Sequence, residues 1–354
     1  MKPIFDGADG PYVLYEENGA VSIVGVDEQG HPYNTTYDVL PKDYSVKVVS
    51  HDGTHRFNVK MKPFERNYWK YESPEKLLVI SDPHGDIGSF LSVLIGNGVM
   101  NENYEWIYGK NGLVIVGDIF DRGVDVLPVL WLTYKLKHEA REAGGALHFV
   151  LGNHESRVLC NDLDFAAAKY EELASYFGIE YASLFGSNTE LGQWVASINT
   201  IEIVGDNLFV HGGLSENFYN GNYDIPYVNE QISSALFLNY AERDKYSDDS
   251  EFLFSSSRSY KGGSGPIWYR GMFGYTDVVD HYLTEEVLDG LLKRYDVKRI
   301  VVGHTEFSEV SFFRNGKVIG VNVHSQKNRE RQASRGILIE DGDIFVIDDK
   351  GGRY

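Results

Sequence analysis

Five short polar motifs, each placed directly after an apolar run, constrain most strongly what this chain can fold into. The runs are short and rich in β-branched residues, as strands buried on both faces are. In open α/β sheets, side chains beyond the carboxyl ends of the strands meet in one crevice. We therefore expect five motifs that are distant in the chain to form a single site. The runs are 77–80, 113–116, 147–151, 208–210 and 299–302, and the motifs are 81–84, 117–123, 152–155, 211–213 and 303–305.

The composition is that of a globular protein. The chain has 354 residues, of which 42% are hydrophobic and 14% aromatic, which is ample for a packed core. Its apolar stretches are shorter than the ~20 residues that cross a bilayer, and residues 1–6 lack the apolar region of a signal peptide. We expect no membrane span and, by default, a cytoplasmic protein, or a periplasmic one if a signal segment was removed.

The net charge argues against nucleic acid as a partner. Thirty-three basic and fifty-two acidic residues give −19, which repels phosphate backbones and anionic membranes. The basic cluster 327–331 is interrupted by Glu330 and is expected to be a solvated loop. An anionic substrate would therefore need bound cations and a few arginines. The single cysteine, Cys160, excludes an intramolecular disulfide and a thiolate cluster, and is expected to be a small packing residue.

The chain divides into two predicted domains. Residues 1–72 show hairpin patterns and predict a small β-rich N-terminal domain. Residues 73–354 alternate strands and helices and predict the larger domain, with a mostly helical excursion around 157–200 that would cover the site. Helices are expected around 90–95 and 126–137, and hairpins at 12–24, 46–60, 312–319 and 337–346.

The residue types in the motifs predict a pair of metal ions. Carboxylates and imidazoles with one amide and no sulfur suit Mn, Fe or Zn better than Ca or Cu. Six ligands are too many for one open catalytic ion, but fit two ions bridged by a carboxylate and a hydroxide. Asp118, central in chain order, is the natural bridge. The candidate ligands are Asp82, His84, Asp118, Asn153, His211 and His304.

Over roughly residues 75–305, the same motifs resemble those of the calcineurin-like metallophosphoesterases, and more narrowly of the phosphoprotein phosphatases. The resemblance implies an α/β fold, the four-layer α/β/β/α sandwich of two mixed sheets, here with the small N-terminal β-rich appendage. It also implies the division of the ligands. Asp82, His84 and Asp118 would hold the first ion, and Asp118, Asn153, His211 and His304 the second.

The resemblance further implies three catalytic roles. His154 would be the general acid, Asp121 its orienting partner and Arg122 a phosphate clamp. The residues themselves agree, because a metal-bound Asn153 would fix the neighbouring His154 beside the reacting phosphorus.

One departure from the classical serine/threonine phosphatases narrows the resemblance. Their Leu-Trp-Ser-Asp-Pro segment is absent after 211–215, where the chain continues as Glu-Asn-Phe-Tyr. The segment 265–271 instead resembles the bacterial Shewanella-like branch, whose matching arginine is the second phosphate clamp. Arg270 is thus a candidate, since its planar fork can bind two phosphate oxygens. The other interpretation is a structural salt-bridge arginine beside a packed Trp268-Tyr269 pair.

Histidines outside the motifs are expected on the surface or in the core: His31, His51, His55, His138, His148 and His281. His324 follows another strand end and is a candidate for supporting the ligands. Asp86 has two interpretations, orientation of a ligand histidine or an acid at a helix N-terminus.

These observations predict a dimetal-dependent phosphomonoester hydrolase, acting by in-line attack of a metal-bridging hydroxide with His154 as general acid. The expected substrate is a phosphorylated protein or peptide, carrying phosphotyrosine, phosphoserine or phosphothreonine, or a small phosphomonoester. Trp268 and Tyr269 are expected to form a rim that holds a phosphotyrosine ring. The alternatives are a dinucleoside polyphosphate hydrolase and a phosphodiesterase of the same fold. A catalytically inactive scaffold is disfavoured, because no ligand is missing.

Overall fold

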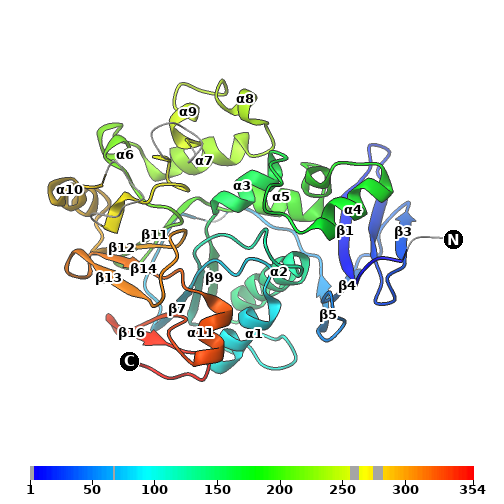
Figure 1. Cartoon of the computed structure of the whole chain (residues 1–354), viewed down its shortest axis with the longest axis horizontal. Helices are drawn as coiled ribbons and strands as arrows, with labels where there is room; N and C mark the ends of the chain where they lie inside the picture. Colours follow the sequence, from blue (N-terminus) through cyan, green and yellow to red (C-terminus); the bar gives the residue numbers. More distant parts are fainter. Residues whose placement is uncertain (1–3, 67, 256–262, 274–281) are drawn as a thin grey trace.

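The computed structural model describes residues 4–66, 68–255, 263–273 and 282–354, and its centre is a pair of sheets (Figure 1). The first has the order β16-β15-β7-β8-β9 and the second β13-β14-β12-β11-β10-β6. Both are mixed. In the first, β7, β8 and β9 are parallel and β15 is antiparallel to β7. In the second, β11 is parallel to β12 and antiparallel to β10. The bounds are β6 Lys70–Tyr71, β7 Lys76–Ile80, β8 Gly112–Ile115, β9 Ala146–Phe149, β10 Ile201–Val204, β11 Asn207–Val210, β12 Arg299–Val302, β13 Ser311–Phe313, β14 Val318–Gly320, β15 Gly336–Glu340 and β16 Asp343–Ile347.

The alternation of side chains along the strands explains why two sheets can stack. Leu77 and Val79 of β7 belong to one apolar cluster together with Phe209 and Val301 of the second sheet. Leu78 and Ile80, which point the other way, belong to a larger cluster that contains the helices. The five strands that carry the motifs are buried on both faces, as their continuous apolar runs predict. The five motif-bearing strands lie in two sheets, as the sandwich fold class requires.

Helices cover the outer faces. α1 Ile87–Gly96 and α2 Val126–Glu142 pack on the first sheet, and α10 Glu285–Tyr295 contributes Leu288 and Leu291 to the larger apolar cluster. α1 begins where the Asp86 carboxylate accepts a hydrogen bond from the Ser89 amide. Of the two interpretations of Asp86, the structure shows the helix cap.

The basic cluster 327–331 is not the loop that its composition suggests. It forms most of α11 Ser325–Arg331, whose charged side chains are exposed. Asn328 is buried and anchors the helix, because its amide donates to the carbonyls of Ser308 and Ser334. The helix is thus held by one inward amide that charge patterning does not reveal.

The N-terminal strands lie at one end of the molecule beside α4 and α5 (Figure 1). They form a three-stranded sheet and a separate hairpin at the two predicted hairpin positions, and β3 is a strand that the sequence did not reveal. Residues 70–71 pair with β10, so this part of the chain also contributes to the second sheet. The division after residue 72 remains a prediction. The bounds are β1 Asp9–Tyr15, β2 Val21–Val26, β3 Pro32–Tyr37, β4 Ser45–Val49 and β5 Arg56–Lys60.

Short helices dominate the connections between the sheets. Cys160 is buried directly after α3, in a packing position. None of the helices in the described ranges is long and apolar enough to cross a membrane. The remaining elements are α3 Asn153–Leu159, α4 Ala168–Phe177, η1 Tyr181–Phe185, α5 Glu190–Ala196, α6 Glu216–Asn220, α7 Ile225–Ala235, α8 Tyr240–Arg243, α9 Ser250–Leu253, η2 Gly271–Phe273 and η3 Arg314–Gly316.

Trp131 of α2 joins the N-terminal strands to the larger core. Its ring is fully buried, and its indole N–H donates to the Pro11 carbonyl at 2.9 Å. Trp131→Ala is expected to lower the free energy of unfolding by about 3–5 kcal/mol, because it leaves a cavity at this junction. Trp131→Phe keeps most of the packing and should cost about 1–2 kcal/mol. Denaturant unfolding measures both, and a loss below about 1 kcal/mol for Trp131→Ala would contradict this account.

Candidate metal centre and active site

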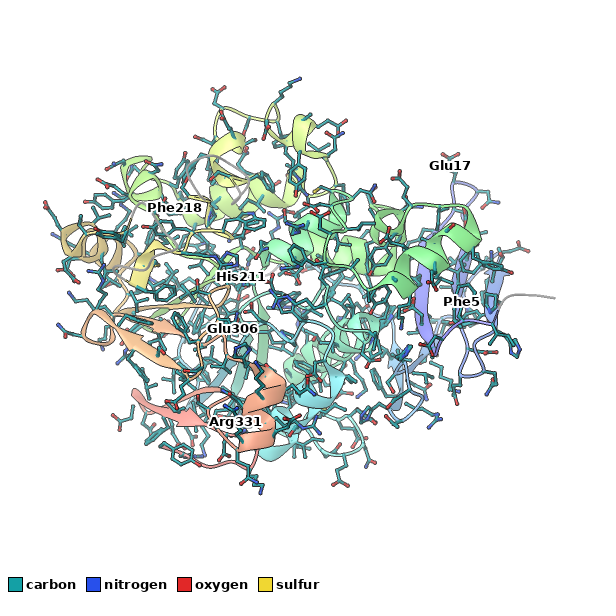
Figure 2. All side chains as sticks on the ribbon, viewed as in Figure 1. Phe5, Glu17, His211, Phe218, Glu306 and Arg331 are labelled. Carbon is teal, nitrogen blue, oxygen red and sulfur yellow. The ribbon has the colours of Figure 1, made fainter. Side chains whose placement is uncertain are left out.

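The motifs that follow β7, β8, β9, β11 and β12 meet in one buried cluster. Asp118 Oδ2 lies 3.0 Å from His211 Nε2 and 3.7 Å from His84 Nε2. His84 Nε2 is also 3.7 Å from Asp82 Oδ2, and His211 Nε2 is 3.0 Å from Asn153 Oδ1. His304 completes a group with Asp118 and His211 in which the ligand atoms lie within 4.8 Å of one another. The structure therefore brings all six candidate ligands together, and Figure 2 shows His211 near the centre of the molecule.

The backbone is strained at these motifs. Six candidate residues have left-handed φ angles, which cost non-glycine residues of the order of 1 kcal/mol or more each. Such a conformation turns the chain sharply as it leaves a strand, so that consecutive side chains face the same crevice. The residues are Asp82 (φ 48°), His84 (41°), Asp118 (58°), Asp121 (68°), Arg122 (64°) and His304 (58°).

The histidine rings are oriented for metal binding. His84 Nδ1 is 2.8 Å from the Phe120 carbonyl, and His211 Nδ1 is 2.7 Å from the Val116 carbonyl. Because a carbonyl only accepts, each Nδ1 carries a hydrogen, and in a neutral ring the Nε2 lone pair is then free. His211 Nε2 lies 3.0 Å from Asp118 Oδ2 and from Asn153 Oδ1. Burial lowers the pKa of His211, but Asp118 and Asp82 outweigh it and raise that pKa to about 9, so a metal ion bound there would displace a proton. Burial is the largest effect on His84 and lowers its pKa to about 3, although Asp118 opposes this. A neutral imidazole is the form that binds metals.

Two buried nitrogens without a partner indicate what the cluster is built for. Within the part of the chain that the structure describes, His84 Nε2 and His304 Nε2 have no hydrogen-bond partner. Orphaned buried polar atoms are rare, and an absent ion is one of their explanations. Two groups of this cluster have the spacing of metal sites, one with His84, Asp118 and His154 and one with Asp118, His211 and His304. The residues present therefore fit divalent metal ions.

The two aspartates are held differently. The Asp82 carboxylate accepts hydrogen bonds from the Ser81 hydroxyl, the His304 amide and the Asn322 amide group, and burial raises its pKa to about 6. For Asp118, burial opposes ionisation, but His211 and His154 hold its pKa well below the ordinary value. Asp118 Oδ1 accepts from the His154 amide, so Oδ2 alone faces the histidines. Asp118 belongs to both metal-like groups, which is the position expected for a bridge.

Sequence reasoning assigned no role to two supporting residues. Asn322 lies two positions before His324, the residue that the sequence indicates as a candidate support for the ligands. His324 is 41% exposed and pairs with Glu306, so it lies outside the cluster. Glu155 is fully buried and accepts backbone hydrogen bonds from Asp118, Ile119, Phe120 and Gly152 at 2.7–3.3 Å. The signal for Glu155 was its place inside the 152–155 motif. For Asn322 the only signal in the sequence was its position at the end of a strand.

His154 adjoins the cluster from α3. Its Nδ1 is 2.6 Å from Asp121 Oδ2, and its Nε2 is 3.9 Å from Asp118 Oδ2. Burial lowers the pKa of His154, but the charges of Asp118 and Asp121 together outweigh it, so that the net direction is upward. The ring is thus fixed by one carboxylate while its other nitrogen faces the cluster.

The two candidate arginines differ in their contacts and exposure. Arg270 Nη1 donates to the His304 carbonyl at 3.0 Å and to the Thr305 hydroxyl at 3.1 Å. Among the described residues no carboxylate forms an ion pair with it, so the salt-bridge interpretation gains no support. Burial and the charge of Arg122 lower the pKa of Arg270, against the pull of Asp82 and Asp118. Arg122 is exposed, and its amide donates to the Phe165 carbonyl at 2.9 Å.

The aromatic rim differs from the expected one. Trp268 and Tyr269 are only 8% and 4% exposed, so neither offers a free ring face. Phe165 is 48% exposed, and its ring centroid lies 5.4 Å from that of His154 in an edge contact. The Arg157 guanidinium lies 4.6 Å from the Phe165 ring centroid and supports it. The exposed aromatic side chain beside His154 is therefore Phe165.

The histidines outside the motifs are also placed. His31, His51, His55, His138 and His148 belong to neither metal-like group. His148 is buried, with Nδ1 2.7 Å from Glu202 Oε2. His281 lies outside the described residues.

Comparisons with known proteins agree with this geometry. The sequence profile of the family described as Calcineurin-like phosphoesterase matches residues 75–305. Shewanella-like protein phosphatase 2 of Arabidopsis thaliana is 25% identical over 302 residues, 73% of each chain. Shewanella-like protein phosphatase 1 of Plasmodium berghei is 27% identical over 255 residues, covering 70% of this chain and 67% of the relative.

A solved structure extends the similarity to nearly the whole chain. The crystal structure of a cold-active protein-tyrosine phosphatase of a psychrophilic Shewanella species superposes with a TM-score of 0.84, at 30% identity and 98% coverage of both chains. The predicted α/β metallophosphoesterase sandwich and the resemblance to the Shewanella-like branch are thereby confirmed. The family uses divalent metal ions. This chain belongs to the calcineurin-like phosphoesterases and is a metal-dependent phosphoric ester hydrolase.

Proposed function

We propose that the protein is a dimetal phosphomonoesterase that acts on phosphorylated proteins, with phosphotyrosine as a favoured residue. The observation that carries the proposal is the half-exposed Phe165 ring set edge-on against His154 at the border of the metal-like cluster. An aromatic ring there is suited to contact an aryl leaving group. The cold-active Shewanella enzyme, named a protein-tyrosine phosphatase, supports the same preference.

In this proposal Asp82, His84 and Asp118 hold one ion, and the second is held by Asp118, Asn153, His211 and His304. Mn, Fe and Zn are the metals that suit these oxygen and nitrogen donors. When bound, such ions supply positive charge for the phosphoryl oxygens and lower the pKa of a water molecule.

The protein's own residues then bind and orient the substrate. Arg122 and Arg270 bind the non-bridging oxygens of a terminal phosphoryl group, which is best matched by a dianionic monoester. His154 holds a proton for the leaving oxygen on Nε2, since Asp121 accepts from Nδ1. The raised pKa of His154 favours that protonated form. The dinucleoside polyphosphate hydrolase and the phosphodiesterase remain the competing functions to be tested.

Metal content separates the two proposed roles in the cluster. His154→Ala should retain two ions by elemental analysis and lose roughly 10²–10⁴-fold in turnover, because it removes only the proton donor. Asp118→Ala is the complementary variant and should weaken the binding of both ions. Loss of an ion from His154→Ala would show that His154 is a ligand instead.

Substrate choice tests Phe165. Phe165→Ala should reduce kcat/KM for a phosphotyrosine peptide by roughly 3–10-fold, since an aromatic contact is worth about 0.5–1.5 kcal/mol. The same peptide with phosphoserine should change by less than about twofold. Tyr176→Ala, at another exposed aromatic residue, is the control. An equal fall for both peptides would refute the aryl contact.

Arg270→Ala should lower kcat/KM for all phosphomonoesters by roughly 10²–10³-fold while both ions stay bound. Arg270→Lys keeps the charge but not the planar fork, and should recover part of the loss. Steady-state kinetics with elemental analysis measures this. If a dinucleoside tetraphosphate exceeds every phosphopeptide by about tenfold or more in kcat/KM, the competing hydrolase function replaces this proposal.

A further inference from the structure

We propose a second ligand site, distinct from the metal cluster, that binds a small organic anion with a flat ring. It is a cavity of about 330 Å³ formed by residues 64–66, 68 and 71, the C-terminal half of α2, the start of β9 and Trp194 of α5. Gly145, Ala146 and Leu147 line it, so it lies at the amino end of β9. Asn153 follows the opposite end of the same strand. The volume is within the range of small-molecule sites.

Positive charge is concentrated at this cavity, although the whole chain carries −19. Lys137, His138 and Arg141 line it from α2. Lys137 Nζ donates to the Leu147 carbonyl at 3.2 Å, and no carboxylate of the described residues lies within ion-pair distance of it. Burial lowers the pKa of Lys137, with Glu202 opposing this. A partly buried ammonium without a paired carboxylate is a natural partner for an anion.

Two further charged residues, Arg66 and Glu65, line the cavity but do not add free positive charge to it. Arg66 lines the cavity, but its guanidinium is engaged by Glu230 and by the Ser233 hydroxyl. Glu65 is exposed at the rim and carries an opposing charge. The anion-binding groups are therefore Lys137 and Arg141, of which Arg141 is exposed.

Two residues of the cavity wall carry polar atoms with no hydrogen-bond partner among the described residues. They are His138, through Nε2, and Trp194, through Nε1. Both atoms are closed off from solvent, and the Trp194 ring is fully buried. The polar groups that line the open space are therefore those of Lys137 and Arg141.

The aromatic residues in the cavity wall indicate that the ligand carries a ring beside its anionic group. Phe64, Tyr71 and Trp194 line the cavity, and Tyr68, 81% exposed, stands at its entrance. Aromatic walls favour a flat apolar body. An anionic head on an aryl ring therefore matches both the charged and the aromatic lining.

The test is calorimetric titration of the metal-loaded enzyme with phenylphosphonate, which has an aryl ring and an anionic head and resists hydrolysis. The wild-type protein should bind two molecules per chain. Arg270→Ala should remove the one at the metal cluster and leave the other. In that background, Lys137→Met or Arg141→Ala should weaken the remaining binding by at least about tenfold, as for a lost charge-assisted hydrogen bond.

Controls separate this site from general charge effects and from misfolding. Lys245→Met, an exposed lysine of the segment after α8, makes the same change of charge and should leave both affinities unchanged. Lys137→Met alone should keep kcat/KM for a phosphopeptide within about twofold, which also shows that it folds. Arg141→Ala provides a second variant at an exposed position. A single wild-type site that Arg270→Ala abolishes would overturn the proposal, as would inorganic phosphate binding the second site as tightly as phenylphosphonate.

Discussion

The structure depends on the burial of two aspartates and three histidines in one cluster. Asp82, Asp118 and His211 are nearly inaccessible, and His84 and His304 each have a buried nitrogen with no partner among the residues described. Burying ionised groups costs several kcal/mol each unless they are paired or bind metal. Divalent ions resolve this conflict, because carboxylates and neutral imidazoles are their ligands. The cluster is thus an arrangement whose stability is linked to metal.

The rest of the fold serves to hold that arrangement against its own strain. Stacking the two sheets brings the ends of five strands to a common edge. Three of these strands belong to one sheet and two to the other. Glu155 fixes the loop of Asp118 through backbone amides, and Asn322 fixes Asp82. Carbonyl groups of Val116 and Phe120 set the histidine tautomers. A left-handed backbone at so many positions persists only because these supports over-determine it.

Much of this could be predicted from the sequence, for a physical reason. Strands buried on both faces leave a continuous apolar signal, and the polar motifs follow directly at the strand ends, so the cluster was predictable from the residues. The two-sheet sandwich was predicted from the resemblance to the metallophosphoesterases. β3 could not be found, because the middle of Pro32–Tyr37 is polar and exposed. α11 was hidden by its charged surface. Trp268 and Phe165 show the remaining limit, since only packing decides which aromatic ring is exposed.

The most direct test of the metal account is anomalous X-ray diffraction from crystals of the protein grown with Mn²⁺. The account predicts two anomalous peaks per chain, both within coordination distance of the Asp118 carboxylate, one shared with Asp82 and His84 and the other with Asn153, His211 and His304. A single peak, or two peaks of which only one contacts Asp118, would contradict it.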